Sequence, residues 1–225
     1  MKILHIDGSP RQESHSRKLS AEIVDKLREV GPGASITRRD LGLEPLPHTL
    51  ADYAVTLSSP STLAAPLKGA LDLSEALIQE VEAADVIVIG TPMYNYTVPP
   101  RIKAWIDQIL RVNRTMKSAP AGKVGMLQDR PVFIGVASGG VFAGERANQP
   151  DFLTPYLSLA LSSRATDPAI PFHTGHGVPR TRTSRIREGQ SARSDRSDGR
   201  ERVPRSVAPG SAHGCATSSL RTPAP

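Results

Sequence analysis

A short apolar run at residues 86–89 constrains the fold of this chain more than any other stretch. Its four residues, Val-Ile-Val-Ile, are all apolar and β-branched. A strand with one face in water alternates apolar and polar side chains, whereas an unbroken apolar run is typical of a parallel strand that helices cover on both faces. Gly90 and Pro92 follow, and Pro99 and Pro100 delay the next helix. The stretch therefore predicts a central strand of an α/β sheet with a loop after it.

The loop after this strand carries side chains suited to a flat ligand. Met93, Tyr94, Asn95 and Tyr96 supply a thioether, two aromatic rings and an amide. In open α/β sheets, ligands bind in the crevice outside the carboxyl ends of the strands. We therefore expect these side chains to face a flat polar heterocycle. The alternative is an ordinary connection between strand and helix, with aromatic rings that fill the core.

Strands and helices alternate along the first 162 residues. Apolar spacing predicts strands near residues 2–6, 36–39, 86–89 and 131–137, and helices near 18–30, 71–81, 102–110 and from 152 onward. We expect loops at 41–68 and 113–130, and a long loop inside a compact domain is often functional. This alternation predicts a doubly wound parallel sheet.

The composition changes at Ser163. Residues 1–162 contain 17 Lys and Arg against 17 Asp and Glu, whereas residues 163–225 contain 11 Arg, 5 acidic residues and no Lys. The pI near 9.8 therefore reflects the C-terminal stretch and does not indicate a nucleic-acid surface on the domain. Because this stretch is poor in apolar residues, it cannot offset the entropy of ordering. We expect a folded domain at 1–162 and a disordered tail at 163–225.

Several functional classes are disfavoured by composition. Cys215 is the only cysteine, so neither an intrachain disulfide nor a cysteine-based metal site is expected. No run of about 18 apolar residues predicts a membrane span. The N-terminal stretch contains His5 and Asp7, which make it too polar for a signal peptide, and we expect a cytoplasmic protein. No catalytic triad or carboxylate pair is evident, so no catalytic side chain is assigned, and His5 is expected to be structural.

A serine-rich loop follows the first predicted strand. Ser9, Ser14 and Ser16 lie near Arg11 and Arg17, where a helix begins. Hydroxyls, free backbone N–H groups and a helix dipole together bind phosphate. The loop matches neither Gly-x-Gly-x-x-Gly nor a Walker A motif, and its few glycines favour a terminal phosphomonoester over a pyrophosphate. The alternative is a helix cap with serines that face solvent.

A third loop follows the strand at 131–137. Its sequence, Ala137-Ser-Gly-Gly140, contains two glycines whose backbone a ligand could approach closely. Taken alone, the same sequence is more typical of a tight turn.

Three motifs together resemble a known family. They are Ser-Pro-Arg-x-x-Ser-x-Ser-Arg at 9–17, Pro-Met-Tyr-Asn-Tyr at 92–96 and Ala-Ser-Gly-Gly at 137–140. In this order and spacing they resemble the FMN-dependent NADH:quinone oxidoreductases and azoreductases of the flavodoxin-like fold. Phe-Leu-Thr-Pro-Tyr-Leu at 152–157 resembles the segment that follows in that family. The likeness covers about residues 1–160, and Pro-Met-Tyr-Asn-Tyr is its most specific part.

The resemblance implies a cofactor, a reaction and an assembly. It implies that NADH or NADPH reduces bound FMN, that a quinone or azo compound then takes the electrons, and that the protein is a homodimer with its active site near the subunit interface. A flavodoxin-like electron carrier and a degenerate, non-catalytic paralogue are the alternatives. The implied FMN contacts are Ser9, Ser14, His15 and Ser16 for the phosphate, Met93, Tyr94, Asn95 and Tyr96 for the isoalloxazine ring, and Ala137, Ser138, Gly139 and Gly140 for the other edge of the ring.

The C-terminal stretch departs from the family pattern. The family continues from the fourth helix into a fifth strand and a closing helix, whereas this chain continues into the Arg-, Ser- and Pro-rich stretch. We therefore expect the last strand and helix to be missing or degraded. Loss of Lys with gain of Arg, Pro, Gly and Ala is what out-of-frame reading of a GC-rich gene produces. Our hypothesis is that the native reading frame is lost near residues 158–166.

Overall fold

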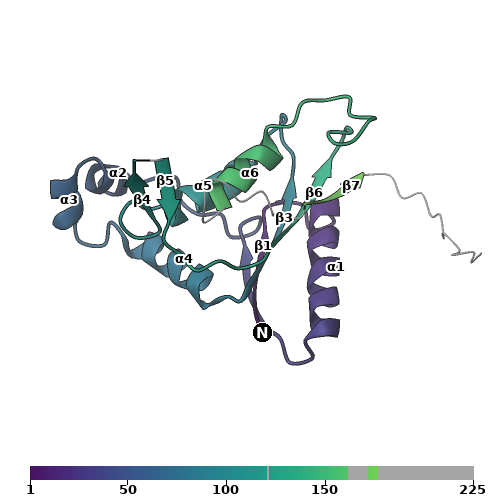
Figure 1. Ribbon diagram of the computed structural model, residues 1–225, viewed down its shortest axis with the longest axis horizontal. Helices are drawn as coiled ribbons and strands as arrows, with labels where there is room; N and C mark the ends of the chain where they lie inside the picture. The colour runs from purple at the N-terminus through teal and green to yellow at the C-terminus, as the bar shows by residue number, and fades with distance from the viewer. Residues whose placement is uncertain (121, 162–171, 177–225) are drawn as a thin grey trace, which may run out of the picture. The chain divides into compact units, whose positions relative to one another are not determined.

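A five-stranded parallel sheet forms the centre of the structure. The computed structural model of the 225-residue chain describes residues 1–120 and 122–161, and the backbone of residues 172–176. The strands are β1 Lys2–Asp7, β2 Ser35–Asp40, β3 Val86–Pro92, β6 Val132–Ser138 and β7 Phe172–His176. Their order is β2-β1-β3-β6-β7, so the chain builds one edge from β1 and then returns to build the other (Figure 1). The predicted doubly wound sheet is confirmed.

Helices cover both faces of this sheet. They are α1 His15–Val30 on one face and α4 Asp72–Ala83, α5 Pro100–Ile109 and α6 Leu153–Leu161 on the other (Figure 1). Val86 and Val88 of β3 belong to the core cluster that contains Val24 of α1. Ile87 and Ile89 belong to the cluster on the opposite face. The strand is therefore buried on both sides, as its unbroken apolar run predicts.

Two glycines allow α1 to lie close against the sheet. A Cβ at Gly90 of β3 would lie 2.5 Å from Ser20 Oγ and 2.7 Å from the Ser16 carbonyl oxygen. A Cβ at Gly135 of β6 would lie 2.9 Å from Leu19 Cβ. Because Gly90 pairs with Gly135 in the sheet, the two form a flat spot on which the first turns of α1 rest.

The connection at 41–68 is not the loop that the sequence predicted. It contains two short helices, α2 Ala51–Leu57 and α3 Pro60–Ala64. At the start of α3, the Thr62 backbone N–H donates to Ser59 Oγ and the Ser59 backbone N–H donates to Thr62 Oγ1, each at 3.2 Å. A Ser-x-x-Thr capping box is a weaker signal than Ser-x-x-Glu. The α2 side chain Tyr53 is buried and donates from its hydroxyl to the Asp107 carbonyl oxygen at 3.0 Å, a tertiary contact that local patterns do not reveal.

The connection at 113–130 also differs from the prediction. It contains a second sheet of two antiparallel strands, β4 Met116–Ala119 and β5 Gly122–Gly125. These four-residue strands carry Lys, Ser and Gly rather than an alternating apolar pattern. Their pairing depends on backbone hydrogen bonds, so periodicity could not reveal it.

The fifth strand of the main sheet is present. β7 pairs in parallel with β6, from Ile134 with Phe172 to Ser138 with His176, so of the two expectations, missing or degraded, the strand is not missing. Pairing at a sheet edge uses backbone groups and needs no apolar periodicity. The closing helix and the disorder expected for the rest of 163–225 concern residues outside those that the structure describes.

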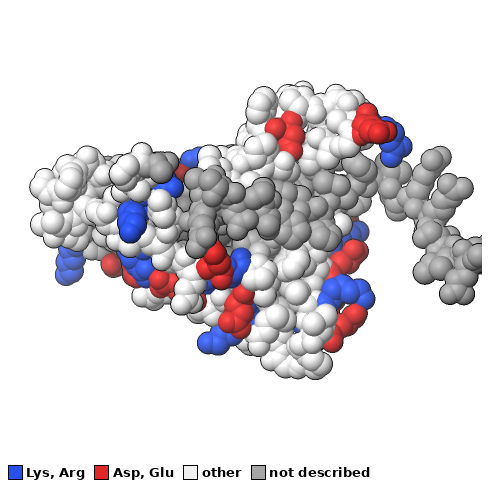
Figure 2. Space-filling view, in the orientation of Figure 1, with Lys and Arg blue, Asp and Glu red and all other residues white. Residues whose placement is uncertain are grey.

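The surface of the described part is mixed in charge. On the face shown in Figure 2, Lys and Arg side chains intermingle with Asp and Glu and form no large patch of one sign. Among the described residues, no helix has both the length and the apolar character needed to cross a membrane.

Candidate functional site

Three loops meet at the carboxyl ends of neighbouring strands. They follow β1, β3 and β6, which are adjacent and parallel. The Gly8 N–H donates to the Gly90 carbonyl oxygen, and the Met93 N–H donates to the Ala137 carbonyl oxygen, each at 2.8 Å. The first and second loops therefore each begin with a hydrogen bond to the neighbouring strand. The strand order reverses between β1 and β3, and this is the point at which doubly wound sheets bind ligands.

The first loop brings the predicted serines together at the start of α1. Ser9, Ser14 and Ser16 are buried, whereas His15 is exposed. Ser14 caps the helix, because its Oγ accepts a hydrogen bond from the Ser16 N–H at 3.3 Å, and the two hydroxyl oxygens are 2.8 Å apart. The alternative of a helix cap is thus correct for Ser14, but the serines do not face solvent as that alternative supposed.

Two backbone donors remain at this helix start. Among the described residues, the amides of His15 and Arg17 have no acceptor. First-turn amides of a helix have no partner within the helix and attract anions. The exposed position of His15 makes its amide the more accessible of the two.

The second loop is a tight turn whose four residues, Tyr94 to Thr97, are exposed. Tyr94 and Thr97 exchange two backbone hydrogen bonds of 3.0 Å. Between them, Asn95 has φ 47° and Tyr96 has φ 70°. Two positive φ angles between paired residues are the geometry of a type I′ turn. The turn leaves both rings partly exposed, Tyr94 at 40% and Tyr96 at 46%, whereas Met93 is buried below them.

The third loop is shorter than predicted, because β6 extends through Ser138. Ala137 and Ser138 therefore belong to the strand, and the loop begins at Gly139. A Cβ at Gly139 would meet no atom within 4 Å, whereas a Cβ at Gly140 would lie 2.5 Å from Gln149 Oε1. A side chain at 140 would thus displace the end of the Gln149 side chain, while the space beside Gly139 is open to a ligand.

Gln149 joins the second and third loops, and sequence reasoning missed it. Its Nε2 donates to Ser138 Oγ at 2.6 Å and lies 3.3 Å from Met93 Sδ. The loop that carries it is closed by Asn148, whose N–H donates to the Val141 carbonyl oxygen at 2.8 Å. A lone Gln in a polar loop has no sequence pattern that predicts this bridge.

His5 lies behind the first loop rather than in it. Its Nε2 is 2.9 Å from Ser20 Oγ and 3.6 Å from Asp7 Oδ1. Burial lowers the pKa of His5, and the nearby Asp7 carboxylate acts in the opposite direction. The contacts agree with the structural role expected for this residue. Among the described residues, no group of three or more His, Cys, Asp or Glu could hold a metal ion.

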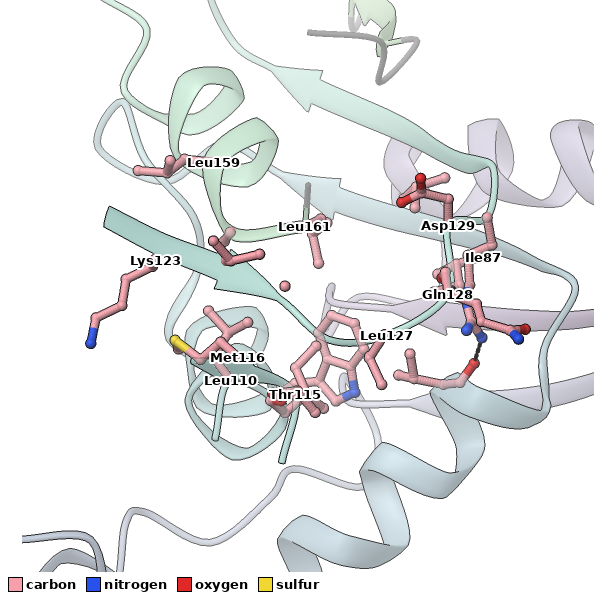
Figure 3. A pocket seen from close by; sticks show the side chains of 18 of the residues that line it. Ile87, Leu110, Thr115, Met116, Lys123, Leu127, Gln128, Asp129, Leu159 and Leu161 are labelled. Atoms are coloured by element: carbon pink, nitrogen blue, oxygen red, sulfur yellow. Dashed lines mark hydrogen bonds between the residues drawn. The ribbon is translucent and has the colours of Figure 1, made fainter. Parts of the chain in front are cut away.

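A cavity of about 730 Å³ lies away from the three loops. It is lined by Ile87, Val132 and Trp105, together with residues of β5 and α6 (Figure 3). Ile87 and Val132 lie near the amino ends of β3 and β6, so the cavity opens at the opposite end of the sheet from the loops. It does not contribute to the candidate site.

Comparisons with known proteins agree with this fold and these loops. The family model described as the flavodoxin-like fold matches residues 1–190. The FMN-dependent NADH:quinone oxidoreductase 4 of Pseudomonas fluorescens (strain Pf-5) is 49% identical over 162 residues, which are 72% of this chain and 77% of that protein.

Two solved structures share the fold. An azoreductase from Bacillus anthracis (strain Sterne) has a TM-score of 0.65 at 22% identity, covering 79% of this chain and 87% of that one. An FMN-dependent NADH-azoreductase from Bacillus anthracis (strain Ames Ancestor), in complex with FMN, has a TM-score of 0.61 at 19% identity, covering 78% and 85%. With sequence identity of this extent to a relative and a family match over most of its length, the chain belongs to the flavodoxin-like family of FMN-dependent NADH:quinone oxidoreductases and azoreductases.

Proposed function

We propose that this protein is an FMN-dependent oxidoreductase that transfers two electrons from NADH or NADPH to quinones or azo compounds by a ping-pong mechanism. The observation that carries the proposal is the meeting of three loops at the point where the strand order reverses between β1 and β3. The name of the 49%-identical relative supports both the cofactor and the reaction.

The first loop fits the phosphate of FMN. Hydroxyls of Ser9, Ser14 and Ser16 and the amides of His15 and Arg17 lie at the N-terminus of α1. A phosphomonoester needs several donors within a small volume, and a helix N-terminus favours its negative charge. Ser14 and Ser16 hydrogen-bond each other, so we expect these hydroxyls to turn toward the phosphate when it binds.

The other two loops fit a flat ring system. The backbone N–H groups of Asn95 and Tyr96 have no acceptor among the described residues, and the open space at Gly139 lets backbone approach the opposite edge. Fixed donors of this kind stabilise negative charge that develops on a ring. Tyr94 and Tyr96 are partly exposed and can bound the space for a second ring by stacking.

The flavin supplies the redox chemistry when bound, because it accepts a hydride from a nicotinamide and passes two electrons to an acceptor. The side chains of this protein would bind and orient the flavin and enclose its substrates. One substrate space beside the tyrosines would serve donor and acceptor in turn, which is the basis of the ping-pong order.

The proposal includes a cytoplasmic homodimer. Tyr94, Tyr96 and Phe152 are exposed by 40%, 46% and 63%. They lie together, because the Phe152 N–H donates to the Tyr96 carbonyl oxygen at 2.9 Å. A partner subunit would cover these rings and complete the wall of the site. Light scattering on the purified protein tests this, and a monomer at micromolar concentration would contradict it.

The function is tested by two measurements on the purified chain. After incubation with FMN and gel filtration, we expect flavin absorption peaks to elute with the protein. We then expect steady oxidation of NADH that depends on an added quinone. Flavin uptake without quinone-dependent turnover would favour the electron-carrier alternative, and a protein that takes up no FMN would favour the degenerate paralogue.

A further inference from the structure

Arg17 lies behind the phosphate loop and not at its mouth. It is the third residue of α1, and only 7% of it is exposed. Its Nε and Nη2 donate to the Ser9 carbonyl oxygen at 3.0 and 2.7 Å. Its Nη1 and Nη2 donate to the two carboxylate oxygens of Asp40 at 2.7 and 2.5 Å. The guanidinium therefore bridges the first loop and the end of β2.

No side-chain donor of Arg17 is left for a ligand. A guanidinium has five N–H groups, and the contacts to Ser9 and Asp40 use four of them. The fifth can serve Asp7, whose Oδ2 lies 3.4 Å from Nη1. Direct pairing of Arg17 with a phosphate would require it to abandon a buried carboxylate, which is costly.

The charges of this cluster balance internally. Asp7 is fully buried, and its Oδ2 also accepts a hydrogen bond from Arg38 Nη2 at 2.8 Å. Two guanidinium groups thus face the carboxylates of Asp7 and Asp40. The hydrogen bond from Arg17 lowers the pKa of Asp40, which keeps that carboxyl charged. Such a cluster supports the loop rigidly and does not supply a free positive charge.

Arg17 determines the direction of the peptide at Ser9. The Ser9 carbonyl oxygen lies in the fork of Arg17, and the Ser9 Oγ accepts a hydrogen bond from the Arg11 N–H at 3.3 Å. Gly42 has no side chain, which leaves room for this carbonyl, and the Gly42 N–H donates to the Asp7 carbonyl oxygen at 3.0 Å. The backbone at Ser9 is therefore held in place by contacts with α1 and with the end of β2.

We propose that Arg17 is a positioning residue that shapes the first loop for a phosphomonoester, so that it determines the preference for FMN over riboflavin. This inference rests on the proposed function. Without the fork on Ser9, the loop loses its fixed shape where the phosphate binds, while the loops that meet the ring are unchanged. The preference for the phosphorylated flavin therefore falls, and affinity for the ring remains.

The test compares dissociation constants for FMN and riboflavin, measured by quenching of flavin fluorescence, in wild type, Arg17→Gln and Arg17→Lys. Arg17→Gln is expected to weaken FMN binding about tenfold or more and to change riboflavin binding less than about twofold. Arg17→Lys keeps the charge but cannot form the fork, and is expected to weaken FMN binding by at least about threefold. Circular dichroism establishes that each variant is folded.

Arg38→Gln is the matched control, because Arg38 also pairs with Asp7 but makes no hydrogen bond to Ser9. It is expected to retain the wild-type ratio of the two dissociation constants. Equal loss of FMN and riboflavin in Arg17→Gln would overturn the inference in favour of a general structural role. A wild-type ratio in Arg17→Lys would overturn it in favour of charge alone, and this variant decides the matter if Arg17→Gln does not fold. A wild-type protein that binds neither flavin would overturn the proposed function itself.

Discussion

Asn95 and Tyr96 have the least ordinary backbone conformation at the candidate site. Left-handed φ angles cost a residue with a Cβ about 1–2 kcal/mol, with Asn among the exceptions. Asn95 at 47° is an accommodating choice, whereas Tyr96 at 70° is not. Strain of this kind persists at functional sites because the surrounding structure imposes it. Here the two hydrogen bonds between Tyr94 and Thr97 impose it.

The first prediction concerns this turn. Asn95→Pro places a residue with φ near −65° where φ is 47°, and it removes the Asn95 backbone N–H. We expect it to weaken FMN binding by about tenfold or more, whereas Asn95→Gly, which keeps the turn and the N–H, should stay within about threefold of wild type. Flavin fluorescence titration measures both. Equal losses of FMN affinity in the two variants would mean that the Asn95 side chain, and not its backbone, contacts the flavin.

Glu75 provides a residue-scale test of electrostatics away from the site. Hydrogen bonds from Arg114 and Arg111 lower the pKa of Glu75 to about 2. The unfolded carboxyl titrates near 4.5. Because the folded pKa is the lower one, the stabilisation is complete above about pH 4.5 and is lost as the pH falls toward 2.

The second prediction follows from this lowered pKa of Glu75. Glu75→Gln should lower the free energy of unfolding at pH 7 by about 1 kcal/mol, a value discounted because a third of the Glu75 side chain is exposed to solvent. Urea unfolding from pH 7 to pH 2.5 should show the difference from wild type shrinking as the pH falls. Glu29→Gln, which breaks an exposed pair with Lys26, should not change the unfolding midpoint at any pH. A difference for Glu75→Gln that is constant with pH would contradict the linkage.

At the scale of elements, the contact between α1 and the sheet holds the candidate site together. α1 packs on β3 and β6, and its N-terminus carries the first loop. Gly90 and Gly135 make this contact possible because side chains there would push α1 away. The orientation of the helix start that we propose to bind phosphate thus depends on two positions in the neighbouring strands.

The third prediction tests this packing. In Gly90→Ala, the new methyl group would lie 2.7 Å from the Ser16 carbonyl oxygen, so backbone must shift. We expect a loss of about 1–3 kcal/mol in the free energy of unfolding, measured by urea denaturation. Gly139→Ala is the control, since its methyl group meets no atom within 4 Å, and it should change stability by less than about 0.5 kcal/mol. Similar effects of the two changes would show that α1 does not rest on Gly90 as described.

At the scale of the whole molecule, β7 and the extent of the relatives' similarity bear on where this chain departs from its family. β7 pairs in register with β6 and lies inside the family match to residues 1–190. The 49%-identical relative aligns over 162 residues of this chain. A frame change near 158–166 therefore stays our hypothesis. Resequencing the gene tests the hypothesis of a lost frame, and a confirmed frame with relatives that share the stretch would refute it.

The fourth prediction separates β7 from the residues after it. A chain that ends at His176 keeps all five strands, and we expect it to keep the FMN affinity of the full chain. A chain that ends at Leu161 lacks β7 and leaves the edge of β6 unpaired. We expect its Tm to be lower by at least about 5 °C, as measured by circular dichroism. Equal Tm values would show that β7 does not stabilise the sheet.

Local sequence patterns predicted the main strands and helices of this molecule. The apolar run at 86–89 predicted a strand buried on both faces, and the spacing at 102–110 predicted α5, because side-chain periodicity reports directly on which surfaces are buried. Parallel strands end on a common edge, so the three loops could be assigned to one site in advance. Short elements with weak patterns, such as α2 and β4, were beyond this reasoning.

The sequence by itself therefore determined the layers of the fold and the rim on which the loops meet. Only the tertiary structure decided that Asn95 and Tyr96 form a strained turn, that Gln149 bridges two loops, and that Arg17 faces Ser9 and Asp40. Arg17 and Asp40 are 23 positions apart. A side chain chooses among acceptors by their positions in space, and those positions exist only after distant segments have packed.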